Sequence, residues 1–375
     1  MKDFLMGSLF LCAGVFSSCQ TEKNKEIVAD DVAEAKFVSE DTITEKKEEQ
    51  TFVHSVMGVG DMMLGTNYPS ASYLPANGGR DMLSAVREKL MDADVTFGNL
   101  EGTLLDKGGT VKRCSNPSLC YAFRSPENYV EHFVNTGFDV VSIANNHTGD
   151  FGASGRRKTK ETLTNAGIAF AGLAGTDETT TFERNGKKYG FAAFAPNTGT
   201  VDIRQISRAK QIVSRLDAEC DIVIVSFHGG AEGAKNQKTP CKTEMYYGEN
   251  RGNVCAFAHA VVDAGADIVF GHGPHVTRAV ELYKNRFIAY SLGNFCTYGR
   301  FNLRGEAGIA PMIKVYVDDN GGFTHAEATS IYQMKAHGPK IDPQNRAIKT
   351  LQRLTKQDFP DTQLTIHDDG FIMKK

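Results

Sequence analysis

Residues 266–276 read ADIVFGHGPHV, and the rest of the chain can be interpreted from this stretch. Its apolar run, 268–270, has the length and composition of a buried strand, and two histidines, His272 and His275, follow directly. The glycine and proline between them give the turn little side-chain bulk and one fixed dihedral angle. A stiff strand that delivers paired histidines to its own carboxyl end favours metal binding. The alternative is a surface turn that is rich in histidine.

From residue 51 onward, apolar runs typical of strands alternate with amphipathic runs typical of helices. The predicted strands are 54–60, 94–97, 138–144, 168–173, 189–195, 221–227, 267–270 and 287–291. The predicted helices are 81–92, 126–136, 154–165, 204–219, 253–264 and 343–356, and DDNGG predicts a hairpin turn between 311–317 and 324–334. This alternation predicts an α/β fold with a mainly parallel central sheet.

Polar side chains follow these strands one after another. In open α/β sheets, ligands bind at the carboxyl ends of the strands. The candidates, in chain order, are Asp61, Asn99, Glu101, Asn146, His147, Asp150, His228, Glu232, His272, His275 and Asn294. Five strands end in residue types that ligate metals and a sixth ends in an amide, so we expect these side chains to converge.

The candidate ligands form a mixed set of carboxylates, amide oxygens and imidazoles. Such a set suits divalent manganese, zinc or iron better than calcium, which prefers oxygen alone. The set exceeds what one tetrahedral ion takes, which predicts two metal ions about 3.5–4 Å apart. Glu101 is the candidate bridging carboxylate, and such a centre would activate water and hold a phosphoryl oxygen.

The remaining strand-end residues have other predicted roles. His147 is the candidate catalytic residue that protonates a leaving group or stabilises charge, with Asp150 orienting its ring. Alternatively, Asp150 caps the next helix. We expect the substrate to contact Asn99, Glu232 and Asn294. Alternatively, the two asparagines satisfy backbone groups and Glu232 is a surface acid. Arg124 and Arg278 are further candidates to meet an anionic substrate.

The amino terminus has the features of an export signal. Lys2 is followed by the apolar run 4–16, which is too short to span a bilayer, and then by Ser17, Ser18 and Cys19. Small residues before a cysteine resemble the lipobox of bacterial lipoproteins, although Phe16 departs from the usual aliphatic residue. The resemblance implies that Cys19 is acylated and anchors the exported chain to a bacterial membrane. The alternatives are an ordinary secreted protein and a buried amino-terminal helix.

Charge divides the rest of the chain into regions. Residues 20–50 carry ten acids and five lysines, a net charge of −5, against −3 for the whole chain. With few apolar residues this segment cannot bury a core, and we expect a disordered acidic tether. The domain is predicted to span 51–340, and 341–375 form a carboxyl-terminal helix and tail of the same domain. No basic cluster interleaved with aromatic residues indicates nucleic-acid binding.

The chain has eight cysteines, and export favours disulfides. Cys114 and Cys120 flank the turn-rich segment SNPSL, which predicts a disulfide between them. Cys241 and Cys255 are the next candidate pair. The remaining two in the body of the chain, Cys220 and Cys296, stand next to predicted strands and are candidates for buried thiols.

Six motifs carry a resemblance to a known family. They are VGDMMLG (59–65), GNLEG (98–102), SIANNHTGDFG (142–152), SFHGGAE (226–232), GHGPHV (271–276) and YSLGNF (290–295). Their order resembles the CapA family of bacterial capsule synthesis proteins, which is associated with poly-γ-glutamate capsules and resembles the calcineurin-like metallophosphoesterases in fold. The resemblance covers about 53–340. It implies a sandwich of two mixed sheets flanked by helices.

Carried over by position, the resemblance implies a set of metal ligands and a catalytic histidine, His147. The implied ligands are Asp61, Glu101, Asn146, His228, His272 and His275. The chain departs from the wider superfamily at Met63, where a histidine is usual, and in the two residues that separate His272 from His275.

Two functions follow as expectations. The first is a lipid-anchored, metal-dependent hydrolase that acts on a phosphoester or another substrate of the cell envelope. The second is a non-catalytic accessory protein that binds capsular polymer, or membrane proteins of capsule assembly, through the same cleft.

Overall fold

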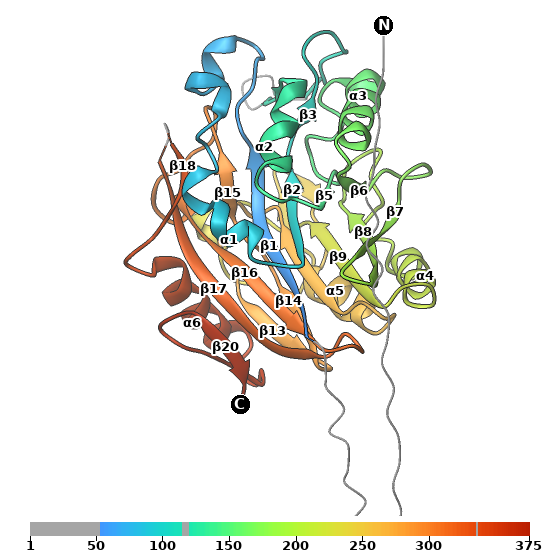
Figure 1. The fold of residues 1–375 in the computed structure, drawn as a ribbon. Coiled ribbons are helices and arrows are strands. Elements are labelled where there is room, and N and C mark those ends of the chain that lie inside the picture. The colour runs from blue at the N-terminus through green and yellow to red at the C-terminus, as the bar shows by residue number, and fades with distance from the viewer. Residues whose placement is uncertain (1–52, 115–119, 335–336) are drawn as a thin grey trace, which may run out of the picture. The chain divides into compact units, whose positions relative to one another are not determined.

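Two β-sheets pack face to face in the computed structural model, which describes residues 53–114, 120–334 and 337–375 (Figure 1). The predicted signal peptide 1–19, with Cys19, and the predicted tether 20–50 lie outside the described residues. The described residues belong to one unit, Gln50–Lys375.

The larger sheet is mixed and has ten strands. Five of its strands run parallel to one another: β1, β2, β5, β6 and β15. The sheet continues from β1 to β16 and β17 through antiparallel pairs. The order is β19-β20-β17-β16-β1-β2-β5-β6, with β15 also paired to β1 and β18 to β17. The bounds are β1 (His54–Met63), β2 (Val95–Leu100), β5 (Val140–Ser142), β6 (Ala169–Ala171), β15 (Asn294–Thr297), β16 (Ile309–Val317), β17 (Phe323–Met334), β18 (Gly338–Ile341), β19 (Leu364–Ile366) and β20 (Phe371–Lys374).

The second sheet has six strands in the order β13-β14-β12-β9-β8-β7. Its four central strands are parallel and both edge strands are antiparallel. The bounds are β7 (Thr179–Arg184), β8 (Lys187–Phe194), β9 (Ile222–His228), β12 (Ile268–His272), β13 (Val280–Tyr283) and β14 (Arg286–Ala289). Two short pairs stand apart, β3 (Thr103–Leu104) with β4 (Arg124–Ser125), and β10 (Met245–Tyr246) with β11 (Glu249–Asn250).

Helices cover the outer faces of the two sheets. Apolar side chains of α1 (Arg87–Met91), α2 (Val130–Val134) and α3 (Gly152–Asn165) share a buried cluster with the larger sheet. Those of α4 (Ile206–Asp217) and α5 (Val254–Val262) pack on the six-stranded sheet. Helix α6 (Arg346–Asp358) contacts strands of both sheets. No helix in the described part of the chain is long and apolar enough to cross a membrane.

The predicted α/β class and the two-sheet sandwich are confirmed. The mainly parallel central sheet expected from the alternation is divided between two mixed sheets, each of which contains a run of parallel strands. Strand β8 pairs with β9 instead of β6, which starts a second sheet, and β16 joins β1 antiparallel. The predicted helix 81–92 is also too long. Val86 has φ −119° and ψ 1°, which breaks the helix and leaves only α1 after a short 3₁₀ turn, Ser84–Val86.

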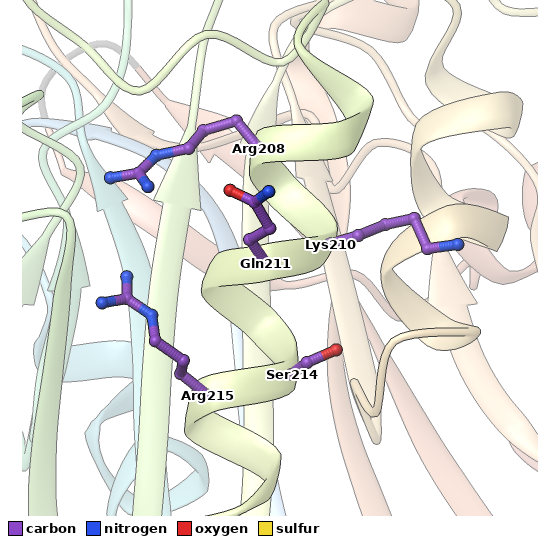
Figure 2. A pocket seen from close by; sticks show the side chains of 5 residues that line it. All are labelled: Arg208, Lys210, Gln211, Ser214 and Arg215. Carbon is purple, nitrogen blue, oxygen red and sulfur yellow. The ribbon is translucent and has the colours of Figure 1, made fainter.

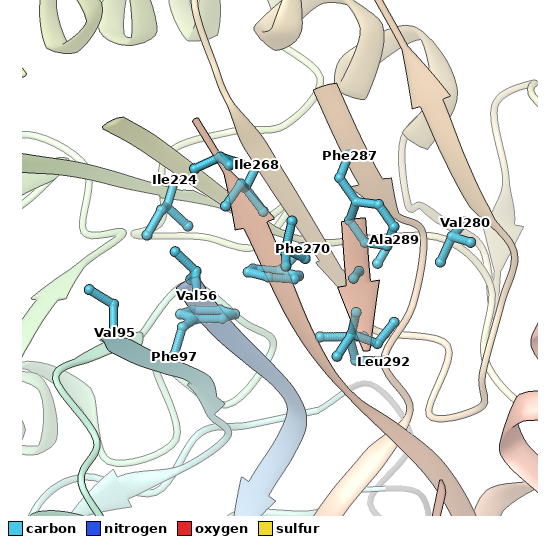
Figure 3. Packing of buried hydrophobic residues seen from close by; sticks show 14 of the residues in the cluster. Val56, Val95, Phe97, Ile224, Ile268, Phe270, Val280, Phe287, Ala289 and Leu292 are labelled. Atoms are coloured by element: carbon cyan, nitrogen blue, oxygen red, sulfur yellow. The ribbon is translucent and has the colours of Figure 1, made fainter. Parts of the chain in front are cut away.

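The core between the sheets is built on stacked aromatic rings (Figure 3). Phe97 of β2 stacks on Phe270 of β12 with ring centres 5.4 Å apart and planes 7° apart. A Cβ at Gly58 of β1 would lie 2.4 Å from the Phe270 ring, so only glycine lets this ring reach the β1 backbone. The edge of His272 lies 5.6 Å from Phe97, measured between ring centres. The same stack therefore joins the sheets and supports a candidate ligand.

Truncating this stack should strongly destabilise the fold. Phe270→Ala removes a fully buried ring, and we expect it to lower the free energy of unfolding by about 3–5 kcal/mol in urea denaturation. Phe371→Ala, at a ring that is 37% exposed on β20, is the matched control and should cost far less. Equal losses for the two variants would contradict the role given to the stack.

Candidate metal centre

Strand register brings the predicted ligands to one place. In the larger sheet, Asp61 of β1 lies opposite Asn99 of β2 on one side and Asn294 of β15 on the other. In the smaller sheet, His272 of β12 lies opposite His228 of β9. Because these strands are parallel, their carboxyl ends fall at a common edge of each sheet.

Asp61, Glu101 and His275 form the middle of this group. One ligand atom from each lies within 4.8 Å of those from the other two. The His275 ring joins the two carboxylates, with Nδ1 2.9 Å from Asp61 Oδ2 and Nε2 3.5 Å from Glu101 Oε1. His272 approaches from the smaller sheet, with Nδ1 3.3 Å from Asp61 Oδ1. Residues 214 positions apart in the chain thus meet across the two sheets.

The turn after β12 is shaped to place His275. Gly273 has φ +111°, and a Cβ there would lie 2.7 Å from the Gly229 carbonyl oxygen, so the loops after β12 and β9 touch through backbone. His275 itself has φ +57°, a left-handed conformation that costs free energy in a residue with a Cβ. Non-glycine residues kept in such a conformation are concentrated at functional sites.

Several polar atoms in this group are buried and make no hydrogen bond to the described residues. They are both oxygens of Glu101, Oδ1 of Asn146, and both ring nitrogens of His228 and of His272. Leaving such atoms without a partner normally costs about 1–3 kcal/mol each, and more for a charged group. A divalent cation is a partner that carboxylate, amide and imidazole donors share. The donor set therefore fits a metal site.

The pKa values reflect the same crowding of charge. Burial raises the pKa of Glu101 well above its ordinary value, and burial lowers the pKa of His228 well below its own. Burial also opposes ionisation of Asp61, but the neighbouring His272 and His275 rings prevail and lower its pKa. His275 is likewise buried, yet Glu101 and Asp61 raise its pKa to about 10. The two neighbouring carboxyl groups thus favour the protonated form of the His275 ring.

His147 stands beside the centre with a defined orientation. Its Nδ1 lies 2.7 Å from Asp150 Oδ2, and its Nε2 lies 4.0 Å from Glu101 Oε1. Since a carboxylate only accepts hydrogen bonds, Nδ1 carries the proton and Nε2 faces the centre as a free base. Burial lowers the pKa of His147, although Asp150 opposes this shift.

Asp150 orients His147 and does not cap the next helix. Its other oxygen lies 2.6 Å from Lys112 Nζ, and the Phe123 backbone N–H donates to Oδ2. Helix α3 begins after Phe151 with no side-chain cap. The sequence did not indicate Lys112 or Phe123, because neither follows a predicted strand.

The predicted substrate contacts of Asn99 and Asn294 do not fit the geometry. Asn99 is fully buried, donates to Asp61 Oδ1 at 2.8 Å and accepts from Asn145. Asn294 donates to the backbone carbonyls of His275 and Ala307. Both amides therefore hold the centre in position. Asn294 satisfies backbone groups, as the alternative expected, whereas Asn99 bonds side chains.

Glu232 is paired with an arginine that sequence reasoning missed. Arg251, whose side chain is only 3% exposed, donates to Glu232 at 2.8 Å and to Glu249 at 3.1 Å. Arg251 follows the β10–β11 hairpin and no predicted strand. The sequence signal at this position was limited to the glycines that flank the end of the hairpin. Glu232 is partly exposed beside the centre and keeps one oxygen for other partners.

The two arginines proposed for an anionic substrate are already engaged. Arg278 is fully buried and makes a two-point contact with Glu244, at 2.8 and 2.7 Å. Arg124 donates to Asn67 and to the Gly108 carbonyl oxygen. These contacts fix loops near the centre, so the prediction that they receive substrate is not supported.

The structure contains two disulfides, Cys114–Cys120 and Cys241–Cys255. Cys220 and Cys296 are free thiols; Cys296 is buried, and burial raises its pKa.

A surface hollow elsewhere on the molecule contains none of the predicted site residues. It lies against α4 and is lined by Arg208, Lys210, Gln211, Ser214 and Arg215 (Figure 2). Arg208 pairs there with Glu178.

Comparison with known proteins agrees with the order of the motifs. The family model described as bacterial capsule synthesis protein PGA_cap matches residues 55–298. The chain belongs to this family. The predicted relationship to CapA proteins is thereby confirmed.

Characterised relatives and solved structures extend this comparison. The capsule biosynthesis protein CapA of Bacillus anthracis is 29% identical over 63% of this chain and 58% of its own length. The PGA biosynthesis protein CapA of Bacillus subtilis is 26% identical over 65% of this chain and 63% of its length. This chain therefore spans less than two thirds of either relative.

Among solved structures, the calcineurin-like phosphoesterase YfkN of Bacillus subtilis has a TM-score of 0.44 at 11% identity and covers 83% of this chain and 98% of its own. A 5′-nucleotidase described as putative, from Staphylococcus aureus, has a TM-score of 0.45 at 16% identity and covers 82% and 58%. Similarities this low do not extend to activity.

A change at Glu101 should have opposite effects with and without metal. In chelator, we expect Glu101→Gln to be at least as stable as the native chain, because it removes a buried carboxyl group whose oxygens accept no hydrogen bond, while Asp61 still pairs with His275. With manganese at a hundred times its dissociation constant, the native chain should gain about 2.7 kcal/mol. The variant should gain much less.

Thermal unfolding in both conditions measures this difference. The matched control is Glu219→Gln, at an exposed acid just beyond the end of α4, which should follow the native chain in both. Full metal stabilisation of Glu101→Gln would contradict the assignment.

Proposed function

We propose that this protein is an exported, metal-dependent hydrolase that acts on a phosphoester or related substrate during synthesis of a glutamate polymer or capsule. The observation that carries the proposal is the group of buried donor atoms without partners at the junction of the two sheets. The family match and the printed names of the relatives, which refer to capsule and PGA biosynthesis, support the biological setting.

Six residues would hold the metal, and Glu101 stands in the middle of them. We assign Asp61, Glu101 and His275 as the shared centre, with His228 and His272 on the side of the smaller sheet and Asn146 on the other. Two ions fit the size of this set, and manganese, zinc and iron fit its chemistry. When bound, they would polarise a phosphoryl oxygen and ease deprotonation of water.

The chain's own acid–base group in this proposal is His147. Its Nε2 faces Glu101, and Asp150 fixes the ring through Nδ1. With its pKa lowered by burial, the ring is mostly neutral at pH 7 and takes up a proton as negative charge develops nearby. Lys112 contacts the other oxygen of Asp150 and holds that carboxylate in place.

Turnover should depend on metal and on His147. With p-nitrophenyl phosphate and its bis-ester as probes, we expect excess chelator to abolish hydrolysis by the full-length chain and manganese to restore it. His147→Asn should lower kcat by about 10²–10⁴-fold, the usual contribution of a positioned acid or base. His367→Asn, at an exposed histidine, is the control and should leave the rate unchanged.

The two expected functions predict different results in this experiment. Loss of turnover in the chelated protein and in His147→Asn supports the hydrolase. Metal binding with no turnover of any phosphoester would instead support the non-catalytic accessory role, in which the same centre binds polymer or assembly partners.

We also propose that the chain is anchored to a bacterial membrane through lipid on Cys19, with 20–50 as the tether that connects the anchor to the domain. The support is the sequence pattern of the amino terminus. Anchoring would keep the centre close to a polymer, and to membrane proteins that assemble it.

Replacement of the anchor residue tests this proposal. In cell fractionation, the native chain should sediment with membranes, and Cys19→Ser should lose lipid labelling. Cys220→Ser, at a free cysteine of the domain, should keep both properties. Lipid labelling that persists in Cys19→Ser would contradict the anchor.

A further inference from the structure

Arg300 lies in the turn that follows β15, the strand paired in parallel with β1. Asn294 at the start of β15 is opposite Asp61, and the Tyr298 backbone N–H donates to the Met63 carbonyl oxygen at 2.9 Å. The turn therefore emerges beside the end of β1, at the edge of the sheet that carries the candidate metal centre.

Two tyrosine rings hold the Arg300 side chain. The Arg300 guanidinium carbon lies 4.5 Å from the centre of the Tyr121 ring and 5.5 Å from that of Tyr73. Gly299 has φ +86°, and a Cβ there would lie 3.2 Å from the Tyr73 carbonyl oxygen, so the turn packs closely on this residue. A guanidinium stacked on aromatic faces keeps its N–H groups directed outward in its own plane.

The stacked arginine adjoins the histidines of the centre through two phenylalanines. The Phe301 ring lies 5.8 Å from that of His275 and 5.0 Å from that of Phe123, measured between ring centres. Phe123 in turn lies 4.3 Å from the His147 ring. We call Tyr73, Tyr121, Phe123 and Phe301 the aromatic rim. Ring contacts in the aromatic rim therefore connect the surroundings of Arg300 with His147 and His275.

Arg300, unlike Arg251 and Arg278, has no anionic partner among the residues that the structure describes. Arg251 is paired with two glutamates and Arg278 with one. For Arg300, no side chain among residues 53–114, 120–334 and 337–375 supplies a hydrogen bond or an ion pair to its guanidinium. A cation held rigidly but left without an anion is suited to receive one from a ligand.

We propose that Arg300 binds a carboxylate or phosphate group of the substrate that is not the group undergoing reaction, while the aromatic rim contacts the apolar part between them. This assignment rests on the proposed function only for the identity of the reacting group. Binding of the second anionic group at Arg300 requires no catalysis. Arg300 is therefore a specificity residue, which selects substrates that carry a second anionic group next to the scissile bond.

Equilibrium binding tests the assignment apart from turnover. The full-length chain in detergent, kept in excess chelator, is titrated calorimetrically with three probes: tri-γ-glutamate, its fully amidated counterpart, and tripolyphosphate. Loss of one charge-assisted contact is expected to weaken binding of an acidic probe to Arg300→Gln about tenfold. Arg300→Lys should recover part of the affinity, because lysine keeps the positive charge but lacks the planar group that can donate two parallel hydrogen bonds.

A control variant and the amidated probe distinguish a specific contact at Arg300 from a general effect of positive charge on binding. Arg304→Gln removes an exposed arginine from the same loop and should bind every probe as the native chain does. The amidated probe should not distinguish native chain from Arg300→Gln. If only tri-γ-glutamate binding weakens, the ligand group is a carboxylate; if only tripolyphosphate binding weakens, it is a phosphate.

Three results would overturn the assignment. They are equal affinity of the acidic probes for the native chain and Arg300→Gln, an equal loss of affinity in Arg304→Gln, and no binding of the acidic probes to the native chain. The chelated experiment is independent of the metal centre. A tenfold loss in Arg300→Gln together with absent turnover would therefore remove the proposed hydrolysis and leave the Arg300 contact in place.

Discussion

The contact between the two sheets is the constraint on which the candidate centre depends. Asp61 and Glu101 come from one sheet and His228, His272 and His275 from the other, so neither sheet alone assembles the set. The Phe97–Phe270 stack fixes their separation directly beneath His272, and Gly58 lets the ring approach the β1 backbone. The hydrophobic core thus sets the distances between candidate ligands that come from distant parts of the chain.

This arrangement is costly for the metal-free protein. Carboxylates and imidazoles are buried with too few partners, and His275 adopts a left-handed backbone conformation. Asn99 and Asn294 offset part of the cost by donating hydrogen bonds to Asp61 and to the His275 carbonyl oxygen. Such sites are tolerated when the surrounding fold determines them strongly and a ligand supplies what is missing.

The sequence predicted the strand ends well, because a buried apolar run followed by a polar residue is a local pattern. It could not predict which strands share a sheet, since that depends on packing between distant segments, and the expected mainly parallel central sheet is divided between two mixed sheets. The hairpin β7–β8 was missed although Asn185-Gly186 is a strong turn signal.

The loop residues that support the centre have no recognisable pattern in the sequence. Lys112, Arg251 and Arg300 follow no predicted strand, and only the fold brings them near Asp150, Glu232 and the aromatic rim. The asparagines carried a local signal, but their actual partners, Asp61 and a backbone carbonyl, are set by register between strands. Chemistry at strand ends was therefore predictable, whereas its supporting contacts were not.

Crystallography of manganese-loaded protein, with anomalous scattering recorded at a wavelength suited to manganese, tests the central claim most directly. The account predicts anomalous peaks within ligand distance of Asp61, Glu101 and His275, with His228 and His272 on one side and Asn146 on the other. Manganese bound elsewhere, with these side chains pointing to solvent or to one another, would contradict it.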